Sequence, residues 1–375
     1  MSCVFALGSN GSGQLGIGHE QDVSVPKPLK WLSQAPTSPI ISIAAGGNHT
    51  LLLSQAGQLY WAGDATSGSC GLVADATPAK DVSVFRELRL SHTDKQELGP
   101  VAMIAATWEA SFVVALDSQG KQMRLYSFGT GTKGELGCGE ALVRTPTASQ
   151  IKGLPVPGTE IVCLAACMDH VVVVLDNGHV YGWGNGRKSQ IGEPSAVVYT
   201  PRKLQGIGFK VVKAVCTKES TCLLGDADSG DICVMGSDKW HLSSEAPSRA
   251  PAWLDAGAGW GTIYILAKNG SLIAWGRGHQ GQLPPRNLPA LKRIAIGSEH
   301  VVALTYDGDV ISWGWGEHGN CGPSLGQDDV KDRWNVIASS KFIPSDSRIH
   351  CIGAGCATSW ICITENQETK DKMKQ

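Results

Sequence analysis

The sequence predicts an all-β fold, a seven-bladed β-propeller, from a repeat that runs through its 375 residues. Each copy contains an apolar strand, a short turn with glycine, and a second strand that ends on glycine. The stretches 171–186 and 301–316 show the pattern clearly. The glycines that end the second strand are Gly8, Gly63, Gly129, Gly184, Gly236, Gly276 and Gly314. Their mean spacing of about 51 residues matches one four-stranded blade with its connections.

The glycine content supports many short strands and tight turns. The chain has 46 glycines, about twice the usual share, without the Gly-X-Y period of collagen. Pairs such as Asn177-Gly178 and Asp307-Gly308 stand between two strand-like runs. They predict two-residue hairpins whose central residues both have positive φ. At the end of the second strand, glycine predicts a close approach of a neighbouring backbone.

The two ends of the chain complement each other. Residues 3–8 have the pattern of a late strand, whereas 349–353 and 359–364 have the pattern of early strands. We therefore expect one blade to combine both ends and to close the ring without an open edge. The predicted domain is 1–364, followed by a disordered polar tail at 365–375. Two further segments, 73–100 and 324–348, are predicted to be long unstructured connections whose role stays open.

Composition excludes several classes of function. Hydrophobic residues make up 42% of the chain and the net charge is −2, so we expect a substantial core and no direct binding of nucleic acid. The twelve cysteines form no CxxC pair. Most of them stand in apolar strand-like runs and are predicted to be buried free thiols, with no metal site and no cofactor. We expect no signal peptide and no membrane span, because the chain opens with a strand pattern and lacks a long apolar run. These features favour the reducing cytoplasm, with the nucleus as a second compartment.

The residues just before the early strand of each repeat should ring the central channel on one face. In a repeat protein, departures from the pattern at such positions carry function. Three tryptophans could act as anchors among acidic residues, as in a protein interface, or could pack between blades. The candidate partner-binding residues are Asn48, Trp108, Glu109, Asp169, Lys218, Glu219, Trp260, Glu299 and Trp360.

Other aromatic and histidine side chains in the repeats are expected to be structural. The histidines at this ring are predicted to bond to blade backbone rather than to a metal; they are His49, His170 and His300. The tryptophans that follow the repeat period are predicted to belong to the core; they are Trp61, Trp183, Trp275 and Trp313.

The element Ala6–Gly16, which contains Gly-Gln-Leu-Gly, and the element Gly46–His49 resemble the family named for the regulator of chromosome condensation. The resemblance covers about residues 1–364. Within that family, residues 1–20 are similar to the fungal alpha-tubulin-suppressor branch. That likeness implies a non-catalytic adaptor whose partner is the small four-cysteine metal protein of diphthamide synthesis. It also implies a link to the Elongator complex, which modifies wobble uridines in tRNA.

Two other functions are known in this family or could be hosted by such a fold. The family's original member exchanges nucleotide on a small GTPase, so guanine-nucleotide exchange is the alternative. Catalysis is not expected, because the sequence contains no Walker loop, no HExxH and no nucleophile–base motif. The plant ultraviolet photoreceptor of the family pairs tryptophan with a following arginine, which is missing after Trp108 and Trp260, so we expect no photoreceptor stack.

Overall fold

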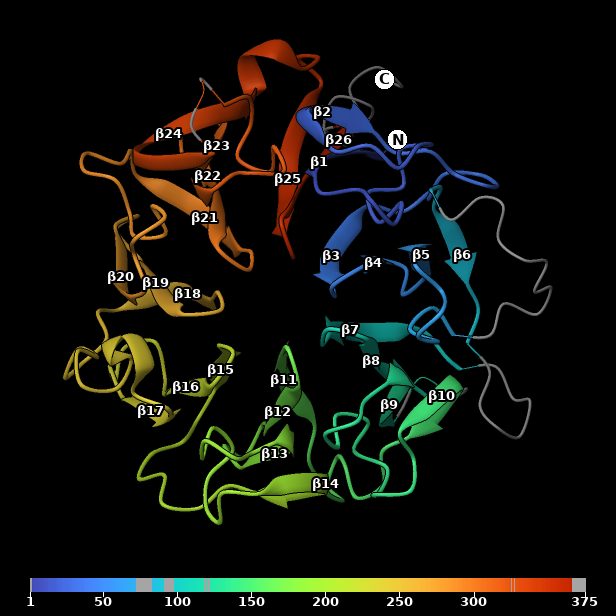
Figure 1. Cartoon of the computed structure of the whole chain (residues 1–375), viewed down its shortest axis with the longest axis vertical. Helices are drawn as coiled ribbons and strands as arrows, with labels where there is room; N and C mark the ends of the chain where they lie inside the picture. The colour runs from blue at the N-terminus through green and yellow to red at the C-terminus, as the bar shows by residue number, and fades with distance from the viewer. Residues whose placement is uncertain are drawn as a thin grey trace, which may run out of the picture.

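The computed structural model shows seven antiparallel sheets arranged as blades around a central channel (Figure 1). It describes residues 2–71, 83–90, 98–117, 120, 122–324, 326 and 328–365. The innermost strands of neighbouring blades contact one another in a closed cycle. The prediction of an all-β, seven-bladed propeller is therefore confirmed.

The blades are numbered here in chain order, and their strands are given from the channel outward. Blade 1 consists of β3 (Ile40–Ala45), β4 (His49–Ser54), β5 (Leu59–Gly63) and β6 (Arg86–Leu88). Blade 2 consists of β7 (Val101–Ala106), β8 (Ala110–Leu116), β9 (Met123–Thr130) and β10 (Arg144–Gln150). Blade 3 consists of β11 (Ile161–Cys167), β12 (His170–Leu175), β13 (Val180–Asn185) and β14 (Val197–Lys203). Blades 4 and 5 have three strands each, namely β15 (Lys213–Cys216), β16 (Ser220–Leu224) and β17 (Ile232–Gly236); β18 (Trp253–Ala258), β19 (Thr262–Ala267) and β20 (Leu272–Gly276). Blades 6 and 7 consist of β21 (Leu291–Ile296), β22 (His300–Thr305), β23 (Asp309–Trp315) and β24 (Asp329–Ser339); β25 (Ser347–Ala354), β26 (Thr358–Glu365), β1 (Ser2–Gly8) and β2 (Val23–Pro28).

The ring closes as predicted, through a blade that both ends of the chain build. Strand β1 pairs with β26 from Ser2 opposite Thr364 to Gly8 opposite Thr358. Figure 1 shows the blue and red strands side by side in this blade. Strand β26 extends to Glu365, one residue beyond the predicted domain end. The rest of the predicted tail, 366–375, lies outside the described residues.

The glycine that ends each third strand has a specific structural cause. In every blade the residue after this glycine donates its backbone N–H to a carbonyl in the turn between the first and second strands, at 2.7–2.9 Å. This bond draws the glycine Cα against the turn, so that a Cβ would lie 2.2–2.6 Å from the carbonyl oxygen. The seven glycines also have φ between 98° and 116°, which other residues rarely adopt. The predicted close approach is confirmed.

The hairpins between second and third strands differ from the prediction. In blade 3 the N–H of Gly178 bonds to the carbonyl of Leu175, and only Gly178 has positive φ, whereas Asn177 does not. The same bond recurs at Gly57, Gly270 and Gly308. These hairpins therefore contain a turn followed by one left-handed glycine, not a two-residue loop with two positive φ angles.

Both predicted unstructured connections were wrong in part. Within 324–348, residues Asp329–Ser339 form β24, the outer strand of blade 6, and Ser340–Phe342 form the short 3-10 helix η2. The sequence pattern does not predict this strand, because three charged residues, Lys331, Asp332 and Arg333, interrupt its apolar pattern. The prediction of an unstructured connection was also wrong for part of 73–100, because Arg86–Leu88 form strand β6 and pair with β5; most of the other residues of this connection lie outside the described part of the chain.

The core lies between the blades. The buried apolar residues form seven clusters, and most of them combine side chains of two neighbouring sheets, such as Trp61 with Phe128 and Phe112 with Trp183. The four repeat tryptophans are all at most 6% exposed, which confirms their predicted structural role. The twelve cysteines, all within the described residues, are free thiols. No helix in the described part of the chain has the length and apolarity of a membrane span.

Candidate functional site

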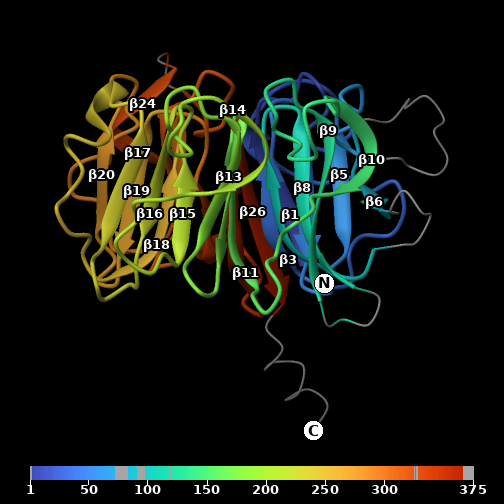
Figure 2. The ribbon, with the colours of Figure 1, turned by 90° about the horizontal axis from the view of Figure 1, so that it is seen from below.

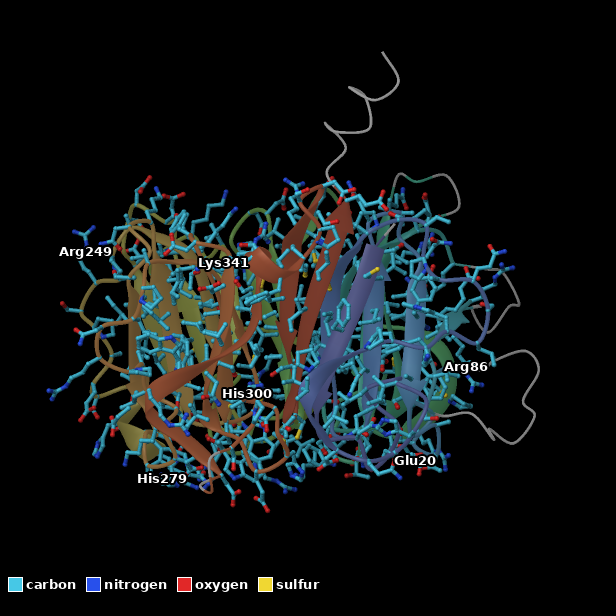
Figure 3. All side chains as sticks on the ribbon, turned by 90° about the horizontal axis from the view of Figure 1, so that it is seen from above. Glu20, Arg86, Arg249, His279, His300 and Lys341 are labelled. Atoms are coloured by element: carbon cyan, nitrogen blue, oxygen red, sulfur yellow. The ribbon has the colours of Figure 1, made fainter. Side chains whose placement is uncertain are left out.

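The seven turns between first and second strands lie on one face of the ring, which we call the loop face. In Figure 3 the labelled His279 and Glu20 lie at this end of the molecule, and Lys341 lies at the opposite end. Each turn offers two ring positions. The first position holds Gly47, Trp108, Met168, Lys218, Trp260, Ser298 and Cys356. The second position holds Asn48, Glu109, Asp169, Glu219, Gly261, Glu299 and Ala357.

Backbone hydrogen bonds link first ring positions of adjacent blades. Trp108 donates its N–H to the carbonyl of Met168 at 2.9 Å and accepts from Gly47 at 2.9 Å. Trp260 donates to Ser298 at 2.7 Å and accepts from Lys218 at 3.1 Å. Because these groups are bonded to each other, the turns hold fixed positions around the channel. The loop face is therefore a rigid platform for its side chains.

Trp108 and Trp260 meet over the mouth of the channel. Their blades lie on opposite sides of the ring (Figure 1), yet the ring centroids are 6.1 Å apart with an angle of 46° between the planes. Trp108 is 37% exposed and Trp260 is half-buried. The Lys218 ammonium lies 3.8 Å from the Trp260 centroid, a cation–π contact. Neither indole belongs to the buried apolar clusters of the described residues, and both lie on the loop face.

Below this pair lies the channel cavity of about 420 Å³. Its wall consists of the inner strands of all seven blades and is rich in small residues, such as Ala105 and Ala165. Trp108 and Trp260 also line it. The two indoles thus stand at the centre of the loop face, with a cavity behind them.

Trp360 lies elsewhere. The turn of blade 7 is Gly355–Ala357, and Trp360 is the third residue of β26. It is fully buried, and its ring packs edge-on against Phe85 with centroids 6.0 Å apart. The sequence pattern placed this turn two residues too late, at Thr358–Trp360 instead of Cys356–Thr358, because the degenerate repeat of blade 7 does not mark the start of its second strand. Trp360 is therefore a core residue rather than a partner-binding residue.

The loop face is less acidic than the sequence suggests. Asp169 forms an ion pair with Lys133 at 2.7 Å and accepts a hydrogen bond from Asn185 at 3.0 Å. Glu299, which is only 4% exposed, forms an ion pair with Arg277 and accepts a hydrogen bond from Gln282 at 2.7 Å. The two ion pairs offset the negative charges of Asp169 and Glu299 on the loop face.

Burial raises the pKa of Glu299, while the Gln282 and Arg277 contacts oppose that shift. Of the remaining candidates at the second ring position, Glu109 and Asn48 are exposed and Glu219 is half-buried. These three side chains, together with Lys218, are accessible to a partner.

The three ring histidines join neighbouring blades. His49, His170 and His300 are buried, and each Nε2 lies 2.9–3.1 Å from a hydroxyl on the second strand of the next blade. The prediction of a backbone partner was wrong, although the role is structural. Ser111 and Ser359 donate their own hydroxyls to backbone carbonyls at 2.7 Å, so they accept the histidine N–H.

These histidine–hydroxyl pairs are poor catalysts. Burial lowers the pKa of His49, His170 and His300 to about 4. The serine hydrogen points to a carbonyl and not to the imidazole, so the imidazole does not activate the serine as a nucleophile. Within the described ranges, no three His, Cys, Asp or Glu side chains gather in a geometry that could hold a metal ion.

Sequence reasoning missed a group of residues between blades 4 and 5. Residues Lys239–His241 form the 3-10 helix η1, the coiled ribbon beside β16 and β17 in Figure 1. Trp240 is 41% exposed on the loop face, near Arg277. A signal was present in the sequence: this repeat has Leu242-Ser243-Ser244 where the others carry the Gln-Leu-Gly element, and Trp240 stands two residues before that departure from the repeat.

These features define a class: a closed seven-bladed β-propeller that presents a rigid ring of turns, with two aromatic side chains at its centre, on one face. The comparison with protein families then places it. The sequence model of the RCC1-like domain matches residues 3–361. The chain belongs to the RCC1-like family, which includes protein-binding members and guanine nucleotide exchange factors.

Two curated relatives show the range of similarity. The chain is 29% identical to an RCC1 repeat-containing protein of Schizosaccharomyces pombe, over 97% of this chain and 100% of that protein. It is 27% identical to the secretion-regulating guanine nucleotide exchange factor of Mus musculus, over 76% of this chain and 62% of that protein. The chain thus spans less than two thirds of the mouse relative.

Solved structures support the fold. Prp20p of Saccharomyces cerevisiae, reported with its binding to Gsp1p and histones, matches with a TM-score of 0.78 at 21% identity and covers 100% of this chain and 95% of that one. Human WBSCR16 matches with a TM-score of 0.77 at 19% identity, over 97% of this chain and 99% of that one.

Proposed function

We propose that this chain is a non-catalytic adaptor or regulatory subunit that binds one small protein through its loop face. Its partner is the small four-cysteine metal protein of diphthamide synthesis, in a heterodimer. Through it the chain supports diphthamide synthesis and Elongator-dependent modification of tRNA wobble uridines. It acts in the cytoplasm, with the nucleus as a second compartment.

The Trp108–Trp260 pair carries the proposal. Two indoles that meet at the centre of a rigid face, one of them 37% exposed, have the properties of interface hot spots: large apolar area and little rotamer freedom to lose. Charged side chains such as Glu109 and Lys218 surround them, as in the polar rim of an interface. The choice of partner rests on the likeness of residues 1–20 to the alpha-tubulin-suppressor branch.

The test is a titration of the small metal protein into this chain by calorimetry, with size-exclusion chromatography to establish a 1:1 complex. Trp108→Ala should weaken binding by roughly 30-fold or more, since loss of a central aromatic anchor costs about 2 kcal/mol or more. Phe342→Ala is the matched control, because Phe342 is 89% exposed and lies near the Gly308 hairpin on the opposite face. Equal affinity of wild type and Trp108→Ala would place the interface elsewhere, and no complex at all would discard this partner.

Guanine-nucleotide exchange is the second candidate. The similarity to the mouse exchange factor favours it, and the loop face would serve this function as well. The assay is release of a fluorescent guanine nucleotide from a panel of small GTPases with micromolar chain. Faster release from one GTPase, lost in Trp108→Ala, would support exchange. Unchanged nucleotide release from every GTPase of the panel would rule out exchange on these GTPases and leave the adaptor function as the proposal.

A further inference from the structure

A small pocket opens on the loop face between blades 4 and 5. It has a volume of about 120 Å³, room for about one short side chain. Its lining includes Lys218, Trp260 and Arg277 from blades 4 and 5, and Lys239 and Trp240 from the η1 segment. Three cationic groups and two indoles therefore converge on one cavity.

The two lysines have free hydrogen-bonding capacity. Lys218 lies 3.8 Å from the Trp260 centroid and Lys239 lies 5.7 Å from the Trp240 centroid. In the part of the chain that the structure describes, neither ammonium group donates to a protein oxygen. Arg277, in contrast, is already bound to Glu299 and to Gln280 at 2.8 Å. The pocket thus presents two unpaired ammonium groups on apolar ring faces.

The segment that carries Trp240 is held in a costly conformation. Trp240 and His241 have φ of 64° and 59°, the left-handed region that residues with a Cβ rarely adopt. The Asp238 carboxylate fixes this turn by accepting hydrogen bonds from the N–H groups of Ser243 and Ser244, both at 2.9 Å. Such local strain is typical of functional sites. Here it places the indole at the pocket.

Glycine at the second ring position of blade 5 completes the pocket. A Cβ on Gly261 would lie 3.0 Å from Cδ1 of Trp240. All six other blades have a larger side chain at this position. Blade 5 therefore leaves the space into which Trp240 packs.

We propose that this pocket binds a single carboxylate of a partner protein, with Lys218 and Lys239 as the donors and Trp240 and Trp260 as the apolar walls. The inference rests on the proposed function, because it assumes that the loop face receives a protein. Glu219 also lines the pocket, and buried Glu299 stands behind Arg277. Their charges disfavour the higher negative charge of a phosphate and leave a site suited to one carboxylate, either of an Asp or Glu side chain or of a chain end.

Peptide probes test the pocket without the partner. The full chain is labelled with 5-fluorotryptophan, and the ¹⁹F resonances are assigned with Trp240→Phe and Trp260→Phe. The first probe is Gly-Leu-Glu-Leu-Gly, acetylated and amidated. The second replaces Glu with Gln, and the third replaces Glu with Gly and ends in a free carboxylate. The Glu probe should shift both resonances saturably, with at least tenfold weaker binding of the Gln probe. The third probe distinguishes a chain end from a side chain.

A double variant identifies the donors. Lys218→Gln with Lys239→Gln should abolish the saturable shift. Lys210→Gln with Lys292→Gln is the control, because it removes the same charge from two exposed lysines outside the pocket. Equal binding of the Glu and Gln probes, no saturable shift, or an unchanged shift in the pocket variant would each overturn the proposal.

Titration of the small metal protein separates this inference from the proposed function. If that protein binds wild type, the pocket variant should bind at least tenfold more weakly, with a smaller loss of affinity as salt rises. If it binds wild type and the pocket variant alike, the pocket proposal fails and the adaptor stands. If it does not bind at all, that partner fails and the peptide result alone decides the pocket.

Discussion

At the scale of single residues, the glycine at the end of each third strand allows that strand to pack closely against the turn between the first and second strands. Gly184 has φ of 98°, and a Cβ there would lie 2.4 Å from the carbonyl oxygen of Asp169. We expect Gly184→Ala to lower the free energy of unfolding by about 3 kcal/mol, from strain and a backbone clash together. Urea denaturation followed by circular dichroism measures it.

Gly208→Ala is the matched control. Gly208 has no positive φ, and a Cβ there meets nothing within 4 Å. Its unfolding free energy should stay within about 1 kcal/mol of wild type or rise slightly, because alanine restricts the unfolded chain. If both variants lose the same stability, the close approach at the third strand is not the cause.

At the scale of elements, the blade that both ends build determines whether the ring is closed. Ala6 of β1 is fully buried and lies opposite Trp360 of β26. Ala6→Glu should cost more than about 3 kcal/mol of unfolding free energy, because it buries an unpaired charge and overfills the core. Cys3→Glu, at an exposed position of the same strand, should change stability by less than about 1 kcal/mol. Equal thermal midpoints for the two variants would contradict a stabilising role of the buried contact between β1 and β26.

The elements also show what the sequence could and could not predict. Second strands such as His170–Leu175 are fully buried, so they are continuous apolar runs that a periodic pattern identifies. Outer strands face solvent, so β24 contains charged residues, and Asp332 even has a positive φ of 57°. Alternation fails there. The hairpin geometry was missed because Asn-Gly suits both a two-residue loop and a turn followed by one left-handed glycine.

The candidate site was predictable in its position but not in its charge. The repeat located the ring of turns, and it brought Trp108 and Trp260 to one face. The two side chains come from blades 2 and 5, and no local sequence pattern predicts a contact between them. The ion pairs that offset Asp169 and Glu299 come from Lys133 and Arg277, at distant sequence positions on neighbouring loops. Sequence spacing gives no access to such pairs.

At the scale of the whole molecule, three buried histidines couple stability to pH. Their folded pKa is about 4, below the value of about 6.5 expected in the unfolded chain. The unfolded state therefore binds more protons between pH 6.5 and 4. Stability is fully present above that window and is lost as the pH falls through it, by up to about 1.4 kcal/mol per pH unit for each histidine.

His170→Gln tests this linkage. Unfolding free energies at pH 7 and pH 5 should differ by about 2 kcal/mol less in the variant than in wild type, because one of the three protonations is removed. His179→Gln, at an exposed hairpin position, should keep the pH dependence of wild type. The same pH dependence in His170→Gln and wild type would show that the interblade histidines do not govern acid unfolding.

The pairing of Ser2 with Thr364 has a practical consequence for the use of this molecule. Strand β1 runs toward the loop face and β26 runs away from it. Ser2 and Thr364 therefore lie on the side of the ring opposite the loop face, as the position of N in Figure 2 illustrates. A chain immobilised on a sensor surface through residue 2 would present its ring of turns to the solution. Fluorophores or fusion domains attached there would likewise stay clear of an incoming partner.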